Sequence, residues 1–202
     1  MKIGPKYKIA KRLGGATFDK TQSQKFQISE ARSAKSRPRF SSKSEFSRQL
    51  LEKQRVRFSY YISEKQFKNY VKAASEVKGG NPLDSLFVAL ETRLDNVVYR
   101  LGLAPTRQAA RQMVSHGHVR VNDRKVTTPS YHVHIGNVIS IRPGSRNKTL
   151  FLSLSEKLKQ YKYPAWVSFN DETMEGKVGS LPKYERAEHH FDLAPVLEFY
   201  SR

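Results

Sequence analysis

The 202-residue sequence contains no cysteine, few acidic residues and no long apolar run. The absence of cysteine excludes a disulfide scaffold, cysteine-ligated zinc, iron–sulfur clusters and thiol catalysis. The longest uncharged run, residues 126–141, contains Pro129 and two histidines, so the sequence predicts no membrane-spanning segment. The opening residues, MKIGPKYKIAKRLGG, have no apolar stretch and no small-residue cleavage site typical of a secretion signal. We therefore expect a cytoplasmic protein.

The shortage of acids makes the chain strongly and unevenly basic. Thirty-seven Lys and Arg face 18 Asp and Glu, giving a formal net charge of +19. The net charge is +12 over 1–60, zero over 61–91, +8 over 92–152 and −1 over 153–202. Such a charge distribution favours a polyanionic partner, and nucleic acid is the first candidate. Solubility alone rarely needs so basic a chain, and the basic regions are not amphipathic helices of the membrane-binding kind.

The first 43 residues predict an extended basic arm. They are rich in Lys, Ser, Gln and Gly, with scattered aromatic residues and little periodicity. Residues 29–43 form a basic, Ser-rich stretch around Pro38. Because this segment can bury too little apolar surface to offset its conformational entropy, we expect it to order only against its partner.

Helical periodicity begins after the arm. Ser63 and Gln66 form a capping box with Ile62 before it, and Pro82 stands at a first helical position, where its missing N–H costs nothing. Thr106 caps a shorter helix. The predicted helices cover about 45–58, 64–78, 82–101 (with room for one break) and 107–115.

After Gly117 the apolar period changes from helical to strand-like, with Asn122-Asp123 as a tight turn. Predicted strands cover 119–121, 125–128, 131–135 and 138–142. The sequence therefore predicts an α+β fold, in which a two-helix motif leads into a small antiparallel sheet. The predicted domains are a basic arm (1–43), a helical domain (44–91), a small αβ domain (92–155) and a C-terminal helix with an irregular tail that packs back on the helical domain (156–202).

Arginines cluster in the predicted αβ domain. Arg107 and Arg111 are one helical turn apart, Arg93 and Arg100 are two turns apart on the preceding helix, and basic residues follow in the hairpin turn. The Arg fork suits phosphate groups, so this pattern predicts a nucleic-acid surface rather than an ordinary solvated face. The candidate binding residues here are Arg93, Arg100, Thr106, Arg107, Arg111, Ser115, His116, Arg124 and Lys125. A second set on the first helix is Lys53, Arg55 and Arg57, of which Lys53 and Arg57 are one turn apart and predicted to face outward.

Metal and catalytic sites have weak support. The pairs His116/His118 and His132/His134 could share a face, but no third ligand is evident, so we predict no metal and no cofactor. No P-loop, dinucleotide-binding fingerprint or nucleophile elbow is present. Glu91 lies near Arg93 and Arg100 on one helix and, like Asp95, is interpreted as an ion-pair partner rather than a catalytic carboxylate.

Three separated blocks carry a resemblance to a known family. They are ETRLDNVVYRLGLAPTRQAARQMVSHGHVRVND at 91–123, LEKQRVRFSYYISEKQFKNYVKAA at 51–74 and VLEFYSR at 196–202. The likeness continues through residues 138–141 and the Met-Glu-Gly triplet at 174–176. In this order, the blocks resemble the family of bacterial small-subunit ribosomal protein number four over almost the whole chain.

The resemblance implies a helical first part with an inserted small αβ RNA-binding domain. It implies a ribosomal protein that binds the 5′ domain of small-subunit rRNA, nucleates subunit assembly and influences decoding accuracy. It also implies contacts with small-subunit proteins three and five and with mRNA where mRNA enters the subunit. The residues that would meet mRNA are Arg32, Lys35, Arg37 and Arg39.

The sequence departs from the family in two places. Some members carry a zinc-binding cysteine cluster near the N-terminus, which this chain lacks, so RNA and packing alone would order the arm. The family's hairpin turn is often Asn-Gly, whereas Asn122-Asp123 stands here, and we expect a slightly strained turn or another turn type.

Two other functions fit parts of the sequence. The resembling αβ domain is also appended to pseudouridine synthases, and the Arg93-Leu94-Asp95 triplet is similar to their catalytic one, but the chain has no separate catalytic domain. A general DNA-binding protein would fit the charge but not the blocks. The sequence therefore predicts a structural rRNA-binding protein without catalysis of its own.

Overall fold

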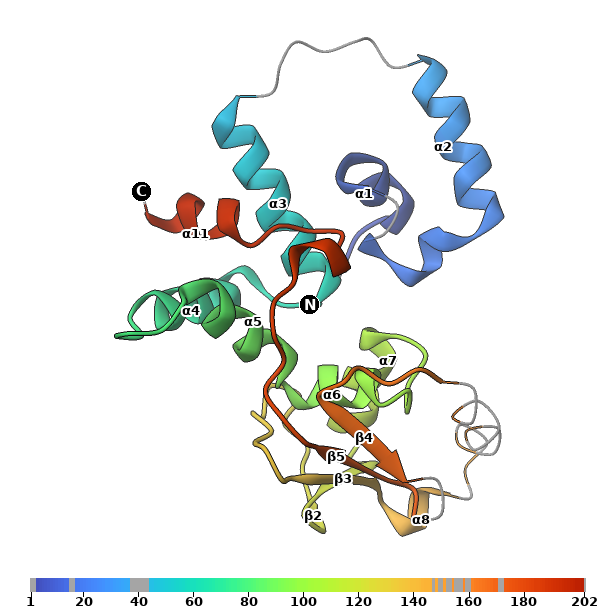
Figure 1. Ribbon diagram of the computed structural model, residues 1–202. Helices are drawn as coiled ribbons and strands as arrows, with labels where there is room; N and C mark the ends of the chain where they lie inside the picture. The colour runs from blue at the N-terminus through green and yellow to red at the C-terminus, as the bar shows by residue number, and fades with distance from the viewer. Residues whose placement is uncertain are drawn as a thin grey trace. The chain divides into compact units, whose positions relative to one another are not determined.

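The computed structural model describes residues 3–14, 17–36, 44–146, 148, 151, 154, 158, 161–170 and 173–201, with the backbone alone at 19 and 33–36. The chain forms two compact units. Unit 1 comprises Met1–Leu86 and Tyr184–Arg202, and unit 2 comprises Phe87–Lys183. Figure 1 shows unit 1 as helices and unit 2 as helices with a sheet. The α+β fold predicted from the sequence is confirmed.

The described part of residues 1–43 is helical, which corrects the predicted extended arm. Helix α1 (Lys6–Leu13), the short 3-10 helix η2 (Asp19–Gln22) and α2 (Gln24–Ser36) follow one another. Phe18 and Phe26 are buried, and the Tyr7 and Phe26 rings meet edge to face at 5.3 Å. Phe18 also packs on Phe58 and Tyr61 at the end of the next helix. The scattered aromatic residues thus form a small core of their own.

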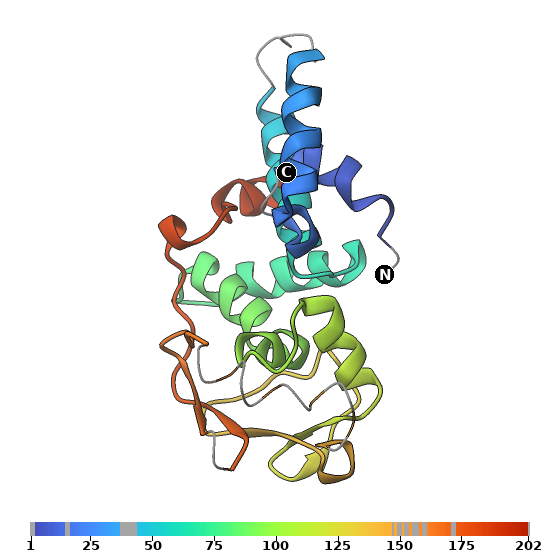
Figure 2. The same cartoon turned by 90° about the vertical axis from the view of Figure 1, so that its right-hand side faces the viewer.

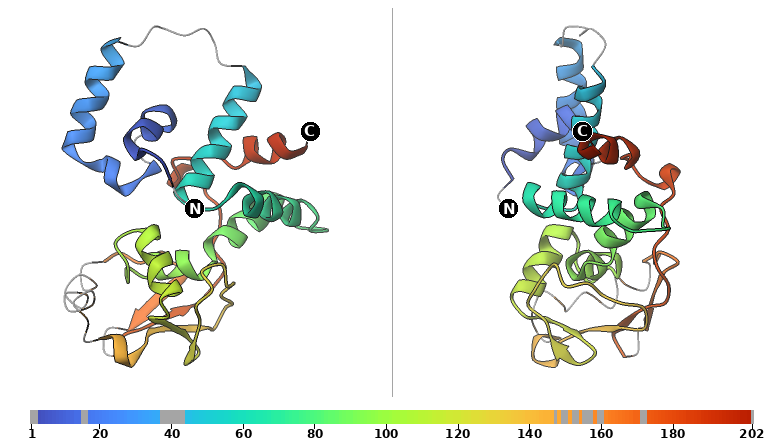
Figure 3. Two further views of the ribbon diagram at one scale, coloured as in Figure 1. Left: turned by 180° about the vertical axis from the view of Figure 1, so that it is seen from behind. Right: turned by 90° about the vertical axis from the view of Figure 1, so that its left-hand side faces the viewer.

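The rest of unit 1 is built from α3 (Glu45–Ser59), α4 (Glu64–Ser75) and the C-terminal α11 (Ala194–Ser201). Ser44 and Ser63 cap α3 and α4, each accepting a hydrogen bond from a backbone N–H in the first turn. Figure 3 shows α11 beside α3. The rings of Phe46 and Phe199 meet at 5.5 Å, and those of Phe67 and Tyr200 at 6.2 Å. Helix α4 ends three residues earlier than the sequence predicts.

The long helix predicted over 82–101 is two helices, α5 (Pro82–Glu91) and α6 (Leu94–Arg100). The break has a physical cause. Arg93 is extended and forms a β-bridge with His132, and the backbone N–H of Leu94 donates to the carbonyl of Tyr131 at 2.8 Å. Residues 131–135, which the sequence predicts as a strand, therefore keep α5 and α6 separate. Within this segment, only His132 forms a β-bridge. Helix α7 (Arg107–Ser115) matches the predicted bounds.

Unit 2 has a five-stranded antiparallel sheet in the order β2-β1-β3-β5-β4. Its strands are β1 (Val119–Val121), β2 (Arg124–Lys125), β3 (Val138–Ile141), β4 (Val167–Asn170) and β5 (Glu175–Val178). Strands β4 and β5 fall in the segment predicted as an irregular tail, which corrects that prediction. The short helix predicted after residue 155 lies mostly outside the described residues. Two short helices, α8 (Pro143–Arg146) and η3 (Arg186–Glu188), complete the described elements.

Helices α6 and α7 cover one face of the sheet, as Figure 2 shows. Ile139 pairs with Gly176 between β3 and β5, and a Cβ at Gly176 would lie 2.4 Å from Leu101 Cδ1. Only glycine therefore lets β5 approach the end of α6 this closely. Asn122 and Asp123 have φ values of 45° and 62°, the pattern of a type I′ turn. In the described ranges, no helix has both the length and the apolarity to cross a membrane.

Candidate nucleic-acid interface

Two acidic side chains, Glu91 at the end of α5 and Asp95 in α6, lie buried beside four arginines. Glu91 is fully buried, and Asp95 is only 4% exposed. Their arginine partners come from the α5–α6 break, the end of α6 and α7. The ion pairs predicted for Glu91 and Asp95 are confirmed, but they are interior rather than on the surface. A buried carboxylate needs charged partners in place of water, so these two acids fix the arginines in position.

Asp95 joins one interior arginine to one outward arginine. Arg93 donates from Nε and from a terminal nitrogen to the two Asp95 oxygens, at 3.0 and 2.7 Å. Its side chain is completely buried. Arg93 was predicted on the RNA face, and this is corrected: it supports the face from beneath. Arg111 lies 3.5 Å from the same carboxylate and remains 35% exposed. Asp95 therefore has both oxygens engaged and lacks the free carboxylate that the catalytic alternative requires.

Glu91 organises the second half of the network. Arg100 donates two hydrogen bonds of 2.7 Å to its two carboxylate oxygens. Asn96 donates to Glu91 at 3.0 Å and accepts a hydrogen bond of 2.7 Å from Arg107. The Arg107 guanidinium also lies 4.6 Å from the centre of the Tyr99 ring, a cation–π contact. Arg100 and Arg107 are therefore held rigidly while 24% and 17% of their side chains stay exposed.

Helix α7 places its polar residues on one face. Arg107, Arg111 and Ser115 recur every four residues, and the exposed His116 follows as the C-cap. Thr106 caps the helix by accepting a hydrogen bond of 3.1 Å from a first-turn N–H. The Ser115 hydroxyl donates to a carbonyl one turn earlier, at 2.9 Å. The opposite face packs into the core through Ala110, Met113 and Val114.

The hairpin after α7 supplies further positive charge. Arg124 and Lys125, which the sequence predicts in the hairpin turn, are exposed and form β2. A Cβ at Gly117 would lie 2.3 Å from Lys125 Cε, so the Lys125 side chain reaches the end of α7. Arg120 pairs with Lys125 across the ladder, and its Nε is buried without a hydrogen-bond partner among the described residues. Arg120 is not among the residues predicted for this surface, although its alternation with Val119 and Val121 indicates a side chain that points away from the core.

The basic residues predicted for RNA on α3 are engaged inside unit 1. Lys53 is only 7% exposed, pairs with Glu64 at 2.7 Å and lies 4.4 Å from the centre of the Phe199 ring. Arg55 donates to the last carbonyl of α1 and pairs with an acid one turn before it. Arg57 donates to the Gln side chain one turn before it at 2.7 Å and lies 3.5 Å from Glu64. The prediction of an outward Lys53 is corrected, and the other two stay partly exposed.

The Glu64 carboxylate interacts with two basic side chains and one hydroxyl group. Burial alone would raise its pKa, but hydrogen bonds from Lys53 and Tyr200 outweigh burial and hold the pKa below its usual value. The Tyr200 hydroxyl donates at 2.7 Å, and burial together with this carboxylate raises the Tyr200 pKa. Both groups therefore keep their ordinary charges at neutral pH, and α11 stays bonded to α4.

The residues predicted to meet mRNA are only partly described. Arg32 is exposed on α2, and the backbone of Lys35 belongs to the same helix. Arg37 and Arg39 lie outside the described residues, as does the side chain of Lys35. The placement of this group therefore stays a prediction.

Two histidines of unit 2, His118 and His132, have lowered pKa values and so add little charge to its surface. Burial lowers the pKa of His132, and the positive charge of Arg93 lowers it further. Burial also lowers the pKa of His118, with smaller contributions from nearby Lys148 and His116. Among the described residues, no three metal-binding side chains come together. The fixed charge of this surface is thus supplied by arginine and lysine.

Comparison with known proteins gives two family matches that together span most of the chain. A family described as "Ribosomal protein S4/S9 N-terminal domain" matches residues 1–91, and one described as "S4 domain" matches residues 92–139. The second match contains the four arginines of the network, α7 and the hairpin.

Curated relatives agree over nearly the full length. A protein of Roseiflexus sp. (strain RS-1) is 42% identical over 211 residues, covering 98% of each chain. One of Streptococcus thermophilus (strain CNRZ 1066) is 46% identical over 159 residues, covering 79% of this chain and 77% of its own. One of Ligilactobacillus salivarius (strain UCC118) is 40% identical over 199 residues, covering 98% of each. All three are named "Small ribosomal subunit protein uS4", a ribosomal protein rather than an enzyme, in agreement with the sequence prediction. This chain belongs to the uS4 family of small ribosomal subunit proteins.

Proposed function

We propose that this chain is a structural constituent of the small ribosomal subunit in the cytoplasm and binds rRNA through α7 and the β1–β2 hairpin of unit 2. The observation that carries the proposal is the set of partly exposed arginines fixed by two buried carboxylates. Four arginines against two acids leave this network positive. Because the guanidinium forks are already ordered, little side-chain entropy is lost when they bind phosphate groups.

The contact residues follow from exposure. Arg100, Arg107 and Arg111 present partly exposed guanidinium groups, and His116, Arg124 and Lys125 are exposed beyond them. Arg120 joins this set because its side chain is only half-buried and it pairs with the exposed Lys125 across the β1–β2 ladder. Side chains cannot reach base edges in the deep groove of A-form RNA, so specificity would come from the shape of the folded RNA.

The finer parts of the proposal rest on the family. They are binding to the 5′ domain of small-subunit rRNA, nucleation of assembly, neighbouring small-subunit proteins three and five, contact with mRNA where it enters, and an influence on decoding accuracy. The exposed Arg32 on the basic helix α2 supports the mRNA contact. The chain has no cysteine, so an R32C variant would carry one unique site for crosslinking within assembled subunits.

The deciding experiment is filter binding of the chain to 5′-domain rRNA and to duplex DNA of equal charge over a salt series. The variant Arg107→Gln/Arg111→Gln should bind rRNA at least tenfold more weakly, with the salt slope reduced by about one to two because about two phosphate contacts are lost. Lys162→Gln/Lys183→Gln removes the same charge from exposed positions of unit 2 and serves as the matched control.

Two results would overturn the proposal. Equal loss of affinity in the arginine and lysine variants would show that charge alone acts, without a defined surface. Equal and equally salt-sensitive binding of the natural chain to rRNA and duplex DNA would remove the ribosomal assignment of the surface. The variant Arg107→Lys/Arg111→Lys keeps the charge but loses the fork, and we expect it to restore only part of the affinity.

A further inference from the structure

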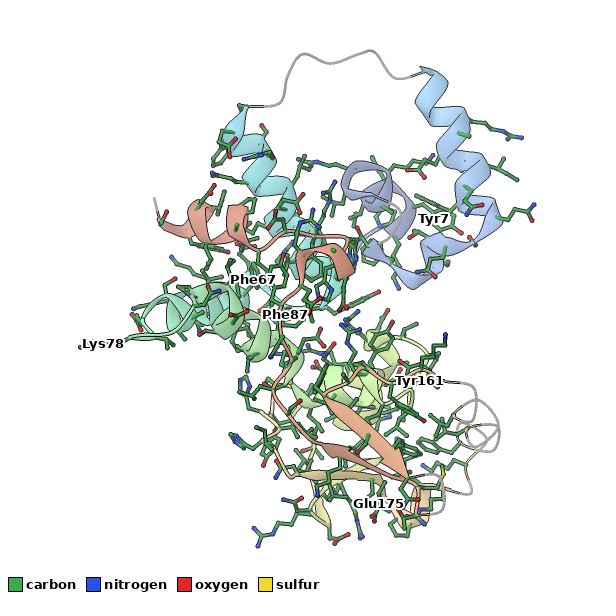
Figure 4. All side chains as sticks on the ribbon, viewed as in Figure 1. Tyr7, Phe67, Lys78, Phe87, Tyr161 and Glu175 are labelled. Carbon is green, nitrogen blue, oxygen red and sulfur yellow. The ribbon has the colours of Figure 1, made fainter. Side chains whose placement is uncertain are left out.

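An exposed tyrosine lies beside the arginine network of unit 2 and is not part of the site described above. Tyr161 is 36% exposed and precedes β4 in the sequence. Its backbone N–H donates to the carbonyl of Leu158 at 3.0 Å, and its hydroxyl donates to the carbonyl of Tyr99 in α6 at 3.4 Å. Figure 4 labels Tyr161 where its segment passes α6. The side chain is therefore attached to the helix that ends with Arg100.

Packing also fixes the position of the Tyr161 ring. A Cβ at Gly102 would lie 3.1 Å from Tyr161 Cγ, so the ring lies directly against the glycine that follows α6. The Tyr161 and Tyr163 rings meet edge to face at 5.2 Å, and the Tyr163 ring stacks on Phe169 at 5.9 Å. An aromatic ring held in this way loses little conformational entropy when a ligand binds to it.

Two arginines of the network lie close to this ring. Tyr99, whose carbonyl accepts the hydrogen bond from Tyr161, has the Arg107 guanidinium 4.6 Å from the centre of its own ring. Burial raises the pKa of Tyr161, and the nearby positive charges of Arg100 and Arg107 oppose that rise. Both guanidinium groups are partly exposed. An exposed aromatic ring and two cations that can bind phosphate groups thus lie side by side.

We infer that Tyr161 is a stacking site for one unpaired base of the bound RNA, whose neighbouring phosphate groups contact Arg100 and Arg107. The inference rests on the proposed function for RNA as the ligand, and it adds that the RNA presents an unpaired nucleotide at this place. Every base has a π face, so an aromatic ring accepts any base that is outside a duplex. The neighbouring rings are less suited, because Tyr99 is covered by Arg107 and the half-buried Tyr163 already stacks on another ring.

The test compares two substitutions of Tyr161 in the full chain. Tyr161→Leu removes the ring and the hydroxyl but keeps an apolar side chain against Gly102. Tyr161→Phe keeps the ring and loses only the hydrogen bond to the Tyr99 carbonyl. The matched control is Tyr131→Leu, which makes the same change at a tyrosine of unit 2 that is 38% exposed.

We expect Tyr161→Leu to bind 5′-domain rRNA about three- to tenfold more weakly than the control, because one stacked base is lost. The salt slope should stay unchanged, because no phosphate contact is lost. Tyr161→Phe should bind within about twofold of the natural chain, because the ring remains. A salt slope that falls together with the affinity would show that Tyr161 only positions the arginines, and an affinity equal to that of the control would show that no base stacks there. Either result would overturn the inference.

Binding to single-stranded and duplex RNA separates this inference from the proposed function. A duplex keeps its bases stacked on one another, so only a single strand can offer a base to Tyr161. Tyr161→Leu should therefore weaken binding to oligouridine and leave binding to the duplex of oligouridine with oligoadenosine unchanged. If the natural chain shows no preference for 5′-domain rRNA over duplex DNA, the proposed function fails, but this comparison still tests the stacking site. An equal effect on both RNAs, or no effect on oligouridine, would contradict the inference.

Discussion

Replacing Glu91 by glutamine tests whether the interior carboxylates hold unit 2 together. Glu91 is fully buried and accepts two hydrogen bonds of 2.7 Å from Arg100. Glutamine has nearly the same shape but no charge, and it turns one acceptor into a donor that faces the guanidinium. Removing one partner of a buried ion pair costs about 3–5 kcal/mol. Because Arg100 is 24% exposed and one acceptor oxygen remains, we expect a loss of about 2–3 kcal/mol in unfolding free energy.

The assay is urea unfolding followed by tryptophan fluorescence. Trp166 is the only tryptophan of the chain and is 8% exposed in the core of unit 2, so its emission reports on that unit. With a urea dependence of about 1–3 kcal/mol per molar, the midpoint should fall by about 1–2 M. Asp123→Asn removes the same charge from an exposed turn of unit 2 and should change stability by less than about 0.5 kcal/mol. A Glu91→Gln shift no larger than this control would refute the reasoning.

Three further perturbations have expected outcomes. Gly176→Ala places a Cβ 2.4 Å from Leu101 Cδ1 and should cost about 1–3 kcal/mol in the same assay, whereas an unchanged midpoint would contradict the close packing of β5. The pKa of His132 is lower in the folded chain, so the unfolded chain binds more protons, and the stability that His132 contributes to unit 2 is complete above about pH 6.5 and decreases below it. The variant His132→Gln should reduce this decrease in stability at low pH. An equal reduction on substituting the exposed His134 would show that the decrease does not come from His132. Tyr200→Phe removes one hydrogen bond between α11 and α4 and should destabilise unit 1 by about 1–2 kcal/mol in circular-dichroism melts, while an unchanged melt would show that the hydroxyl contributes nothing.

Local signals predicted much of the helical structure. Thr106 caps α7 and Ser63 caps α4 as expected, because a side-chain oxygen three residues before a free N–H is a short-range feature that a sequence displays directly. The sequence does not decide whether residues 82–101 form one helix or two, because the break between α5 and α6 is caused by a distant segment. The bridge from Arg93 to His132 joins residues far apart in the sequence.

Non-local pairing accounts for the missed strands. Strands β4 and β5 have four residues each, and β5 becomes a strand because Ile139 pairs with Gly176 across a long sequence separation. A short segment with a central glycine carries little strand signal of its own. Phe18 and Phe26 were likewise assigned to an extended arm, because their packing partners lie in other segments.

The sequence predicts which residues form the candidate site, but not which of them are buried. The sequence located Arg107 and Arg111 on one helical face, which needs only the helical period. It predicts Arg93 and Lys53 to face outward, although both are buried and each forms an ion pair with a carboxylate. Charged residues are rarely buried, so the expectation of exposure was reasonable, and the acids that overturn it come from neighbouring turns and helices.

The two pieces of unit 1 have a consequence for how the chain folds during synthesis. Unit 1 includes Met1–Leu86, yet its helices α3 and α4 also pack against α11 from the other end of the chain. Unit 2 is continuous in sequence and needs nothing made after Lys183. A chain synthesised from its N-terminus therefore completes unit 2 first. Helices α3 and α4 can pack against α11 only after the C-terminal residues have been made. Folding order is the reverse of the order in which the two units begin.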